Sequence, residues 1–136
     1  MACTGETERG SRLLPPPEAA TAPACGPTIG ETRANTSLVP DIFLIGETPK
    51  VTRVIESQQG YSAAILLQIA LDPALEEYRS IVKQAGYEIL NEDYEGFEAE
   101  IYMREGADYV TLQLRETACE DETVAYLRVI YEEVGG

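Results

Sequence analysis

Residues 72–86 constrain the fold most, because the sequence marks both ends of one helix there. Asp72 and Pro73 are typical of a helix N-terminus, and Gly86 is typical of the left-handed residue that follows a helix. Between them the apolar residues recur on one stripe, with Ile81 beside it: Leu75, Tyr78, Val82 and Ala85. The sequence therefore predicts one amphipathic helix that buries a single face.

The segment before the helix reads as strands. An apolar stretch at residues 38–45 begins the structured part, and residues 51–57 are predicted to form a strand that turns at residues 58–60. Residues 61–71 read as one long strand, with Ile65, Leu67, Ile69 and Leu71 on one face. Two strands are therefore expected ahead of the helix.

The segment after the helix alternates polar and apolar residues, which is typical of an antiparallel meander with one buried face. A turn centred on residues 105–106 would pair Ile101 with Val110, and the same register would pair the buried Phe97 with Leu114. Extending it to the last strand pairs Leu112 with Leu127. The strand from residue 123 onward is expected at an edge of the sheet.

These segments together predict an α+β fold of two layers, in which one helix packs on an antiparallel sheet of about five to six strands in the order ββαββββ. Residues 38–136 would form this domain. Residues 1–37 are rich in Pro, Thr and Ala and hold almost no large apolar side chains, so we expect a flexible tail there.

The amino-acid composition argues against several classes of partner and active site. A net charge of −14 argues against nucleic acid as a partner, because a phosphate backbone would be repelled. The absence of histidine removes the Ser-His and Cys-His pairs and the imidazole metal ligands. The acidic clusters at residues 92–95 and 120–122 lack the spacing of a calcium loop. We therefore expect no catalytic residue, no cofactor and no metal site.

One short pattern resembles a known family. The run D-P, F-Y-R, A-G-W-x-V belongs to a small domain of bacterial exported proteins and lipoproteins of unassigned function. This chain resembles that domain over about residues 50–132, and its similar run is Asp72-Pro73, Tyr78-Arg79 and Ala85-Gly86-Tyr87-Glu88-Ile89. Glu77 replaces an aromatic residue of that run, and Tyr87 replaces its tryptophan. The resemblance implies a low-complexity tail behind a lipidated cysteine.

Cys3 is the candidate for lipidation. It follows Ala2 and precedes a polar, proline-containing tail, as an acylated cysteine does at the start of an exported lipoprotein. Acylation of Cys3 would attach the chain to the cell envelope through a lipid anchor alone, with the tail as a tether. The alternative is an ordinary cysteine near the start of a cytosolic protein.

Cys25 and Cys119 form the candidate disulfide. Exported chains favour such bonds, and this one would close a loop of about 95 residues, which stabilises the fold by on the order of 4 kcal/mol in the chain-entropy model. No CxxC motif occurs, so a redox role is not expected. The alternative is two independent thiols.

The polar face of the sheet is the candidate binding surface, with Tyr102 expected opposite Tyr109. Tyrosine and arginine dominate binding hot spots, although a solvated sheet also favours tyrosine. The candidate residues are Tyr102, Tyr109, Thr111, Gln113, Tyr126 and Arg128.

These features favour a monomeric, non-enzymatic accessory domain of the bacterial envelope, lipid-anchored, that binds an envelope protein or another ligand. The alternative is an intracellular acidic protein-interaction domain with a disordered tail. A hydrolase that uses carboxylates alone is a third, weaker hypothesis.

Overall fold

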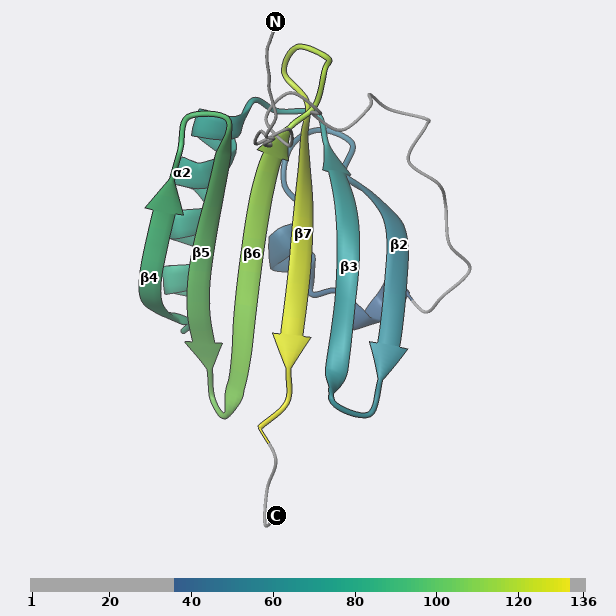
Figure 1. Cartoon of the computed structure of the whole chain (residues 1–136), viewed down its shortest axis with the longest axis vertical. Helices are drawn as coiled ribbons and strands as arrows, with labels where there is room; N and C mark the ends of the chain where they lie inside the picture. Colours follow the sequence, from purple (N-terminus) through teal and green to yellow (C-terminus); the bar gives the residue numbers. More distant parts are fainter. Residues whose placement is uncertain (1–35, 133–136) are drawn as a thin grey trace, which may run out of the picture.

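A computed structural model describes residues 36–132 and shows one α-helix and one six-stranded antiparallel sheet (Figure 1). The fold is therefore α+β, and its elements follow the predicted order ββαββββ. Their bounds are η2 (Thr36–Leu38), η3 (Asp41–Phe43), β2 (Lys50–Ser57), β3 (Gly60–Leu67), α2 (Leu71–Gln84), β4 (Glu88–Tyr94), β5 (Glu98–Glu105), β6 (Asp108–Glu116) and β7 (Thr123–Ile130).

The strands lie in the order β2-β3-β7-β6-β5-β4. After β3 the chain passes through α2 to the far edge of the sheet, and the meander β4 to β7 then returns until β7 pairs with β3 (Figure 1). The prediction that the last strand is an edge is therefore wrong, because β7 is hydrogen-bonded on both sides. The edges are β2 and β4, and each carries an irregularity in its register, which is a common way to protect an exposed edge.

The helix ends as predicted but begins earlier. Gly86 has a φ of 94°, and the N–H groups of Gly86 and Tyr87 donate to the carbonyls of Lys83 and Val82, which is the Schellman arrangement. At the other end α2 begins at Leu71, a buried residue, and Asp72 makes no capping bond. The predicted long strand was therefore wrong in its last part, since β3 ends at Leu67 and burial of Leu71 draws it into the helix.

The main hydrophobic core lies on one face of the sheet, and a smaller buried cluster lies on the opposite face, formed by Ala64, Leu66 and Val124. We call the face that carries the main core the closed face. The buried residues of α2 belong to the same cluster as the inward residues of β3, β5, β6 and β7. Phe43 of η3 is also fully buried there, and its ring lies 6.1 Å from that of Tyr78 and 5.7 Å from that of Tyr87, centroid to centroid. The Tyr78 hydroxyl donates a 2.7 Å hydrogen bond to the Phe43 carbonyl. The segment before β2 thus completes the core beside the helix.

The side chains of β5, β6 and β7 lie on the predicted faces, but the register between β5 and β6 differs from the predicted one. Leu112 pairs with Leu127 as predicted, whereas Ile101 pairs with Leu112 rather than with Val110. The turn lies at residues 106–107, one position later than expected, so each partner moves by two residues and stays on its face. Phe97 is the exception. It precedes β5 and is 38% exposed, so its predicted burial is wrong.

Within residues 36–132 no helix is long and apolar enough to cross a bilayer. Most of the predicted tail, residues 1–37, lies outside the part of the chain that the structure describes.

Candidate functional site

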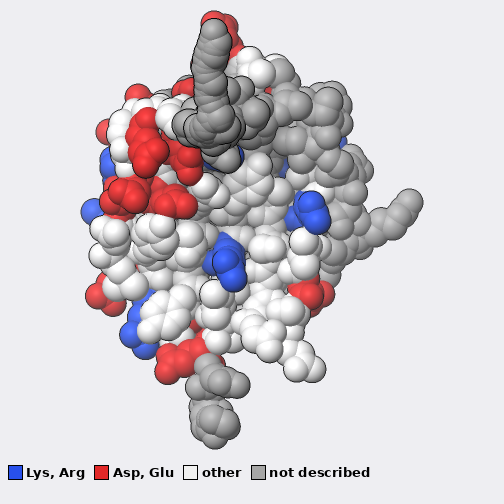
Figure 2. Space-filling model, in the orientation of Figure 1, with Lys and Arg blue, Asp and Glu red and all other residues white. Residues whose placement is uncertain are grey.

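The face of the sheet opposite the core is the candidate site, and we call it the open face. It faces the viewer in Figures 1 and 2. Its side chains line up in rows across neighbouring strands, because residues that pair across adjacent strands point to the same face of a sheet. One central row runs from β2 to β5 through Ile55, Ser62, Arg128, Thr111 and Tyr102.

A shallow hollow of about 920 Å3, here called the trough, lies on the open face. It extends from β2 across β3 and β7 to Thr111 and Gln113 on β6 and Glu100 on β5. Its floor holds the small residues Gly60, Ser62 and Ala64. Larger side chains rise on both sides: Arg53 and Ile55 from β2, and Tyr126, Arg128 and Ile130 from β7. The trough therefore follows from residue size, since the floor strand is flanked by two strands that carry long side chains.

Gly60 closes one end of this floor and tolerates no side chain. A Cβ atom at this position would lie 1.9 Å from the Val129 carbonyl oxygen on β7. The backbone of β3 thus approaches β7 more closely here than any other residue type would allow.

A β-bulge at Thr52 orients Arg53 toward the trough. Val51 pairs with Ile65 and Arg53 pairs with Ala64, so Thr52 is an additional residue in β2. The Thr52 side chain is buried and donates a 3.3 Å hydrogen bond to the Ala64 carbonyl. Because the bulge shifts the alternation by one residue, Arg53 and Ile55 share the open face with Lys50.

Two arginines, Arg53 and Arg128, line the trough. Across residues 36–132, no hydrogen bond or ion pair involves the guanidinium group of Arg53 or of Arg128. Figure 2 shows two blue patches that stand apart on a mainly white surface over this part of the face.

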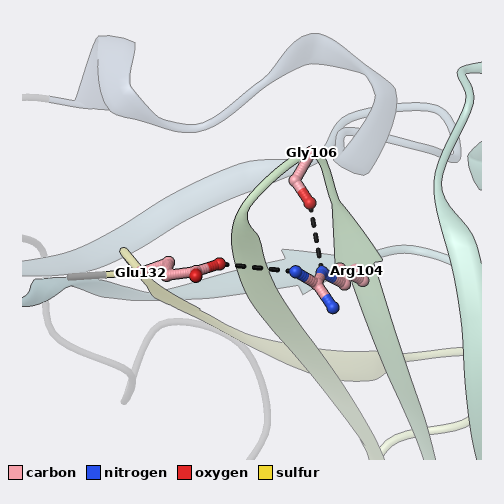
Figure 3. Close-up of polar contacts among 3 residues, drawn as sticks. All are labelled: Arg104, Gly106 and Glu132. Carbon is pink, nitrogen blue, oxygen red and sulfur yellow. Dashed lines mark hydrogen bonds and ion pairs between the residues drawn. The ribbon is translucent and has the colours of Figure 1, made fainter. Parts of the chain in front are cut away.

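Arg104 on β5 is the contrasting case (Figure 3). Its guanidinium donates to the Gly106 carbonyl at 3.1 Å, approaches a Glu132 carboxylate oxygen at 3.4 Å and lies 5.2 Å from the centroid of the Tyr109 ring. Its hydrogen-bonding groups are therefore already engaged within the chain.

The half of the open face over β4 and β5 is acidic and internally bonded, and Figure 2 shows red atoms gathered there. The Glu98 carboxylate accepts a 2.6 Å hydrogen bond from Gln113 and lies 3.8 Å from the Arg115 guanidinium. The Tyr102 hydroxyl donates to Glu100. That hydrogen bond, followed by desolvation and nearby carboxylates, raises the pKa of Tyr102 above its ordinary value.

The structure divides the predicted binding residues into two groups. Thr111, Gln113, Tyr126 and Arg128 all line the trough. Tyr102 and Tyr109 share the open face but lie outside the trough, and they are not opposite each other, because Tyr102 pairs with Thr111 and Tyr109 with Arg104. The predicted tyrosine pair is therefore wrong.

The sequence interpretation missed the β2 and β3 side of the trough, namely Arg53, Ile55, Ser62 and Ala64. The signal for the floor was present as Gly60, Ser62 and Ala64, which are small residues at every second position. The near-continuous apolar run of β3 concealed this alternation, and the bulge at Thr52 concealed the face of Arg53.

The other candidate residues lie apart from the trough. Cys119 is exposed in the loop between β6 and β7, whereas Cys3 and Cys25 fall outside the described residues. The two acidic clusters are separately bonded: Glu92 pairs with Arg79 at 2.8 Å, and buried Glu122 accepts a hydrogen bond from Thr117 at 2.8 Å. Among residues 36–132 no group of three potential ligands could hold a metal ion.

No protein-family model, curated protein or solved structure matches this chain.

Proposed function

We propose that this protein is a non-enzymatic binding domain of the bacterial cell envelope and that the open face is its binding surface. The single observation that carries the proposal is the trough, where exposed arginine, tyrosine and isoleucine side chains surround a floor of small residues. Such a combination favours binding, because aromatic and arginine side chains give large contact energies once they are desolvated.

The closed face supports the same proposal from the other side of the sheet. We propose a two-layer arrangement in which α2 and residues 38–45 cover the closed face, since their buried residues share one cluster with the sheet. The domain is then stabilised mainly through one face and leaves the trough on the other available to a ligand. A partner on the open face would need no rearrangement of the core.

Export and lipid anchoring are part of the proposal and are supported by the sequence. The resemblance to exported domains and the position of Cys3 favour acylation of that cysteine. A bond between Cys25 and Cys119 is proposed on the same grounds, and the disulfide-bonded state of Cys119 supports it. The proposed monomer would stand off from the bilayer on its tail.

The binding surface is tested by comparing two variants of the full chain. The double variant Tyr126→Ser, Ile130→Ser removes large side chains from the open face, and Glu77→Ser changes an exposed residue of α2 as the control. We expect the wild-type protein to retain binding partners from envelope extract and the open-face variant to lose them. In the wild-type protein, the bound material should slow amide hydrogen exchange in β3 and β7. Retention by the double variant equal to wild type would contradict the proposal.

The location is tested by intact-mass spectrometry of the protein purified from its native cells. A diacylated Cys3 with one disulfide is the expected result. An unmodified N-terminus with three free thiols would instead favour the alternative, an intracellular acidic interaction domain. Turnover that disappears when the carboxylates of both acidic clusters are changed to amides would favour the hydrolase hypothesis. These are Glu92, Asp93, Glu95, Glu120, Asp121 and Glu122.

A further inference from the structure

The trough combines three properties that together specify a ligand. It has a floor without large side chains, apolar and aromatic walls, and two guanidinium groups that make no bond within residues 36–132. The one carboxylate in its lining, Glu100, accepts a hydrogen bond from Tyr102. Unpaired arginines are unexpected in a chain with a net charge of −14, where carboxylates are abundant. We propose that the trough binds a small amphiphilic carboxylate, with its head between Arg53 and Arg128 and its apolar body along Ile55, Ile130 and Tyr126. This inference rests on the proposed function, since it names the ligand of the same open face.

The arginines are placed to share one anionic head. Arg53 pairs with Ala64, and Arg128 pairs with Ser62, so the two face each other diagonally across β3. Strand spacing and rise put their Cα atoms about 12 Å apart. Side chains that lean over the small floor residues can therefore approach the same carboxylate from two sides. A guanidinium and a carboxylate match in geometry, and two donors converging on one head favour a carboxylate over a neutral group.

The apolar body of the ligand has matching neighbours. Ile55 is 50% exposed, and Ile130 and Tyr126 are about 40% exposed, so three large apolar side chains contact water around one hollow. A ligand that covers these side chains removes apolar surface from water, which favours binding. The hollow of about 920 Å3 is within the size range of small-molecule sites.

Two features disfavour an acidic peptide as the occupant. The backbone groups of β3 are already hydrogen-bonded to β2 and β7, so the floor offers no ladder for an added strand. The long-range field of this acidic chain also repels a ligand with many negative charges. A ligand with one negative charge gains the local contacts of two arginines and suffers little of that repulsion.

The test uses three simple probes and amide NMR spectra of the full chain. Octanoate carries the proposed head and an apolar body, octylammonium carries the same body with the opposite charge, and acetate carries the head alone. We expect octanoate to shift amide signals of β2, β3 and β7. Octylammonium should leave them unshifted, and acetate should bind at least about tenfold more weakly because it buries little apolar surface.

Matched variants separate the site from the overall charge. Arg53→Gln and Arg128→Gln should each raise the Kd for octanoate about tenfold, equivalent to about 1.4 kcal/mol. Arg104→Gln is the control, because it removes the same charge from the same face at an arginine whose bonds lie within the chain. Ser62→Tyr fills the floor of the trough without changing the charge of the chain, and it should abolish octanoate binding. This variant therefore tests the site independently if an arginine variant fails to fold.

Several outcomes would overturn the inference. Octylammonium binding as tightly as octanoate, or an equal loss from Arg104→Gln and Arg128→Gln, would show that the trough does not select a carboxylate. Tighter binding of a tetraglutamate peptide at the same signals would assign the face to an acidic peptide. If octanoate fails while the open-face variant still loses its partner from extract, only the ligand class is wrong. If that variant keeps its partner, the proposed function itself fails.

Discussion

The two faces of this sheet are built from the same strands and differ at every alternate residue. On β7, Leu127 is fully buried on the closed face, while its neighbours Tyr126 and Arg128 are exposed on the open face. The closed face holds apolar side chains that contact α2 and the segment before β2, whereas the open face holds polar and large side chains around a trough. Stability therefore depends mainly on one face, which leaves the composition of the other free for binding.

The open face itself is divided in the same way. Over β5, polar groups are bonded to each other, as Glu98 is to Gln113 and Arg104 is to Glu132. Over β2 and β7, Arg53 and Arg128 make no such bond within the described residues. A face that only had to be soluble would have little reason to keep arginines unpaired among so many carboxylates, and this contrast locates the proposed site.

The largest expected effect is on the closed face. Leu127→Ala removes a fully buried side chain at the centre of the sheet and should lower the free energy of unfolding by about 2–5 kcal/mol. Arg128→Ala, one residue along, should change it by less than about 0.5 kcal/mol. Urea denaturation followed by circular dichroism measures both. Similar losses from the two variants would break the distinction between the faces.

A smaller loss is expected from one buried hydrogen bond. Tyr78→Phe leaves the Phe43 carbonyl without its partner and should cost about 1–3 kcal/mol of unfolding free energy. Tyr126→Phe removes an exposed hydroxyl on the open face and serves as the control, with an expected change near zero. Equal midpoints for Tyr78→Phe and wild type in urea would show that the contact is replaced by water.

The burial of Tyr61 on the closed face should make the free energy of unfolding depend on pH. Burial, with smaller contributions from Tyr87, Tyr131 and Asp108, raises the pKa of Tyr61 from 10.0 to about 12. The folded state therefore holds this proton more tightly than the unfolded state does. The stabilisation is complete below pH 10 and is lost as the pH rises toward 12. Tyr61→Phe should flatten this part of the stability profile, measured by urea denaturation across that range, and an unchanged slope would contradict it.

The smallest effect is expected where charges are already exposed. Arg79 and Glu92 form a 2.8 Å ion pair between α2 and β4, with side chains 41% and 27% exposed. Arg79→Gln should lower the unfolding free energy by less than about 1 kcal/mol, and added salt should reduce the difference. A loss as large as that of Leu127→Ala would show that the pair, rather than apolar burial, holds this end of the helix to the sheet.

Some parts of this structure could be read from local sequence. Gly86 ends the helix because its position needs a left-handed residue, and the alternation in β5, β6 and β7 assigns each side chain to a face. The pairing of Leu112 with Leu127 followed from that alternation. The register of β5 with β6 was missed because turns centred at neighbouring positions preserve the same faces.

The sequence by itself determined the order of the helix and strands, the apolar faces of the meander strands and the acidic character of this protein, because these depend on local periodicity and composition. Tertiary structure alone decided that β7 lies at the centre of the sheet and that β3 forms a floor between two strands of larger side chains. It also decided that the bulge at Thr52 places Arg53 on the open face, where it lines the same trough as Arg128. The two-residue period of a strand indicates which face of the sheet each residue occupies. It carries no information about which strand lies beside it. The proposed site depends on those neighbours.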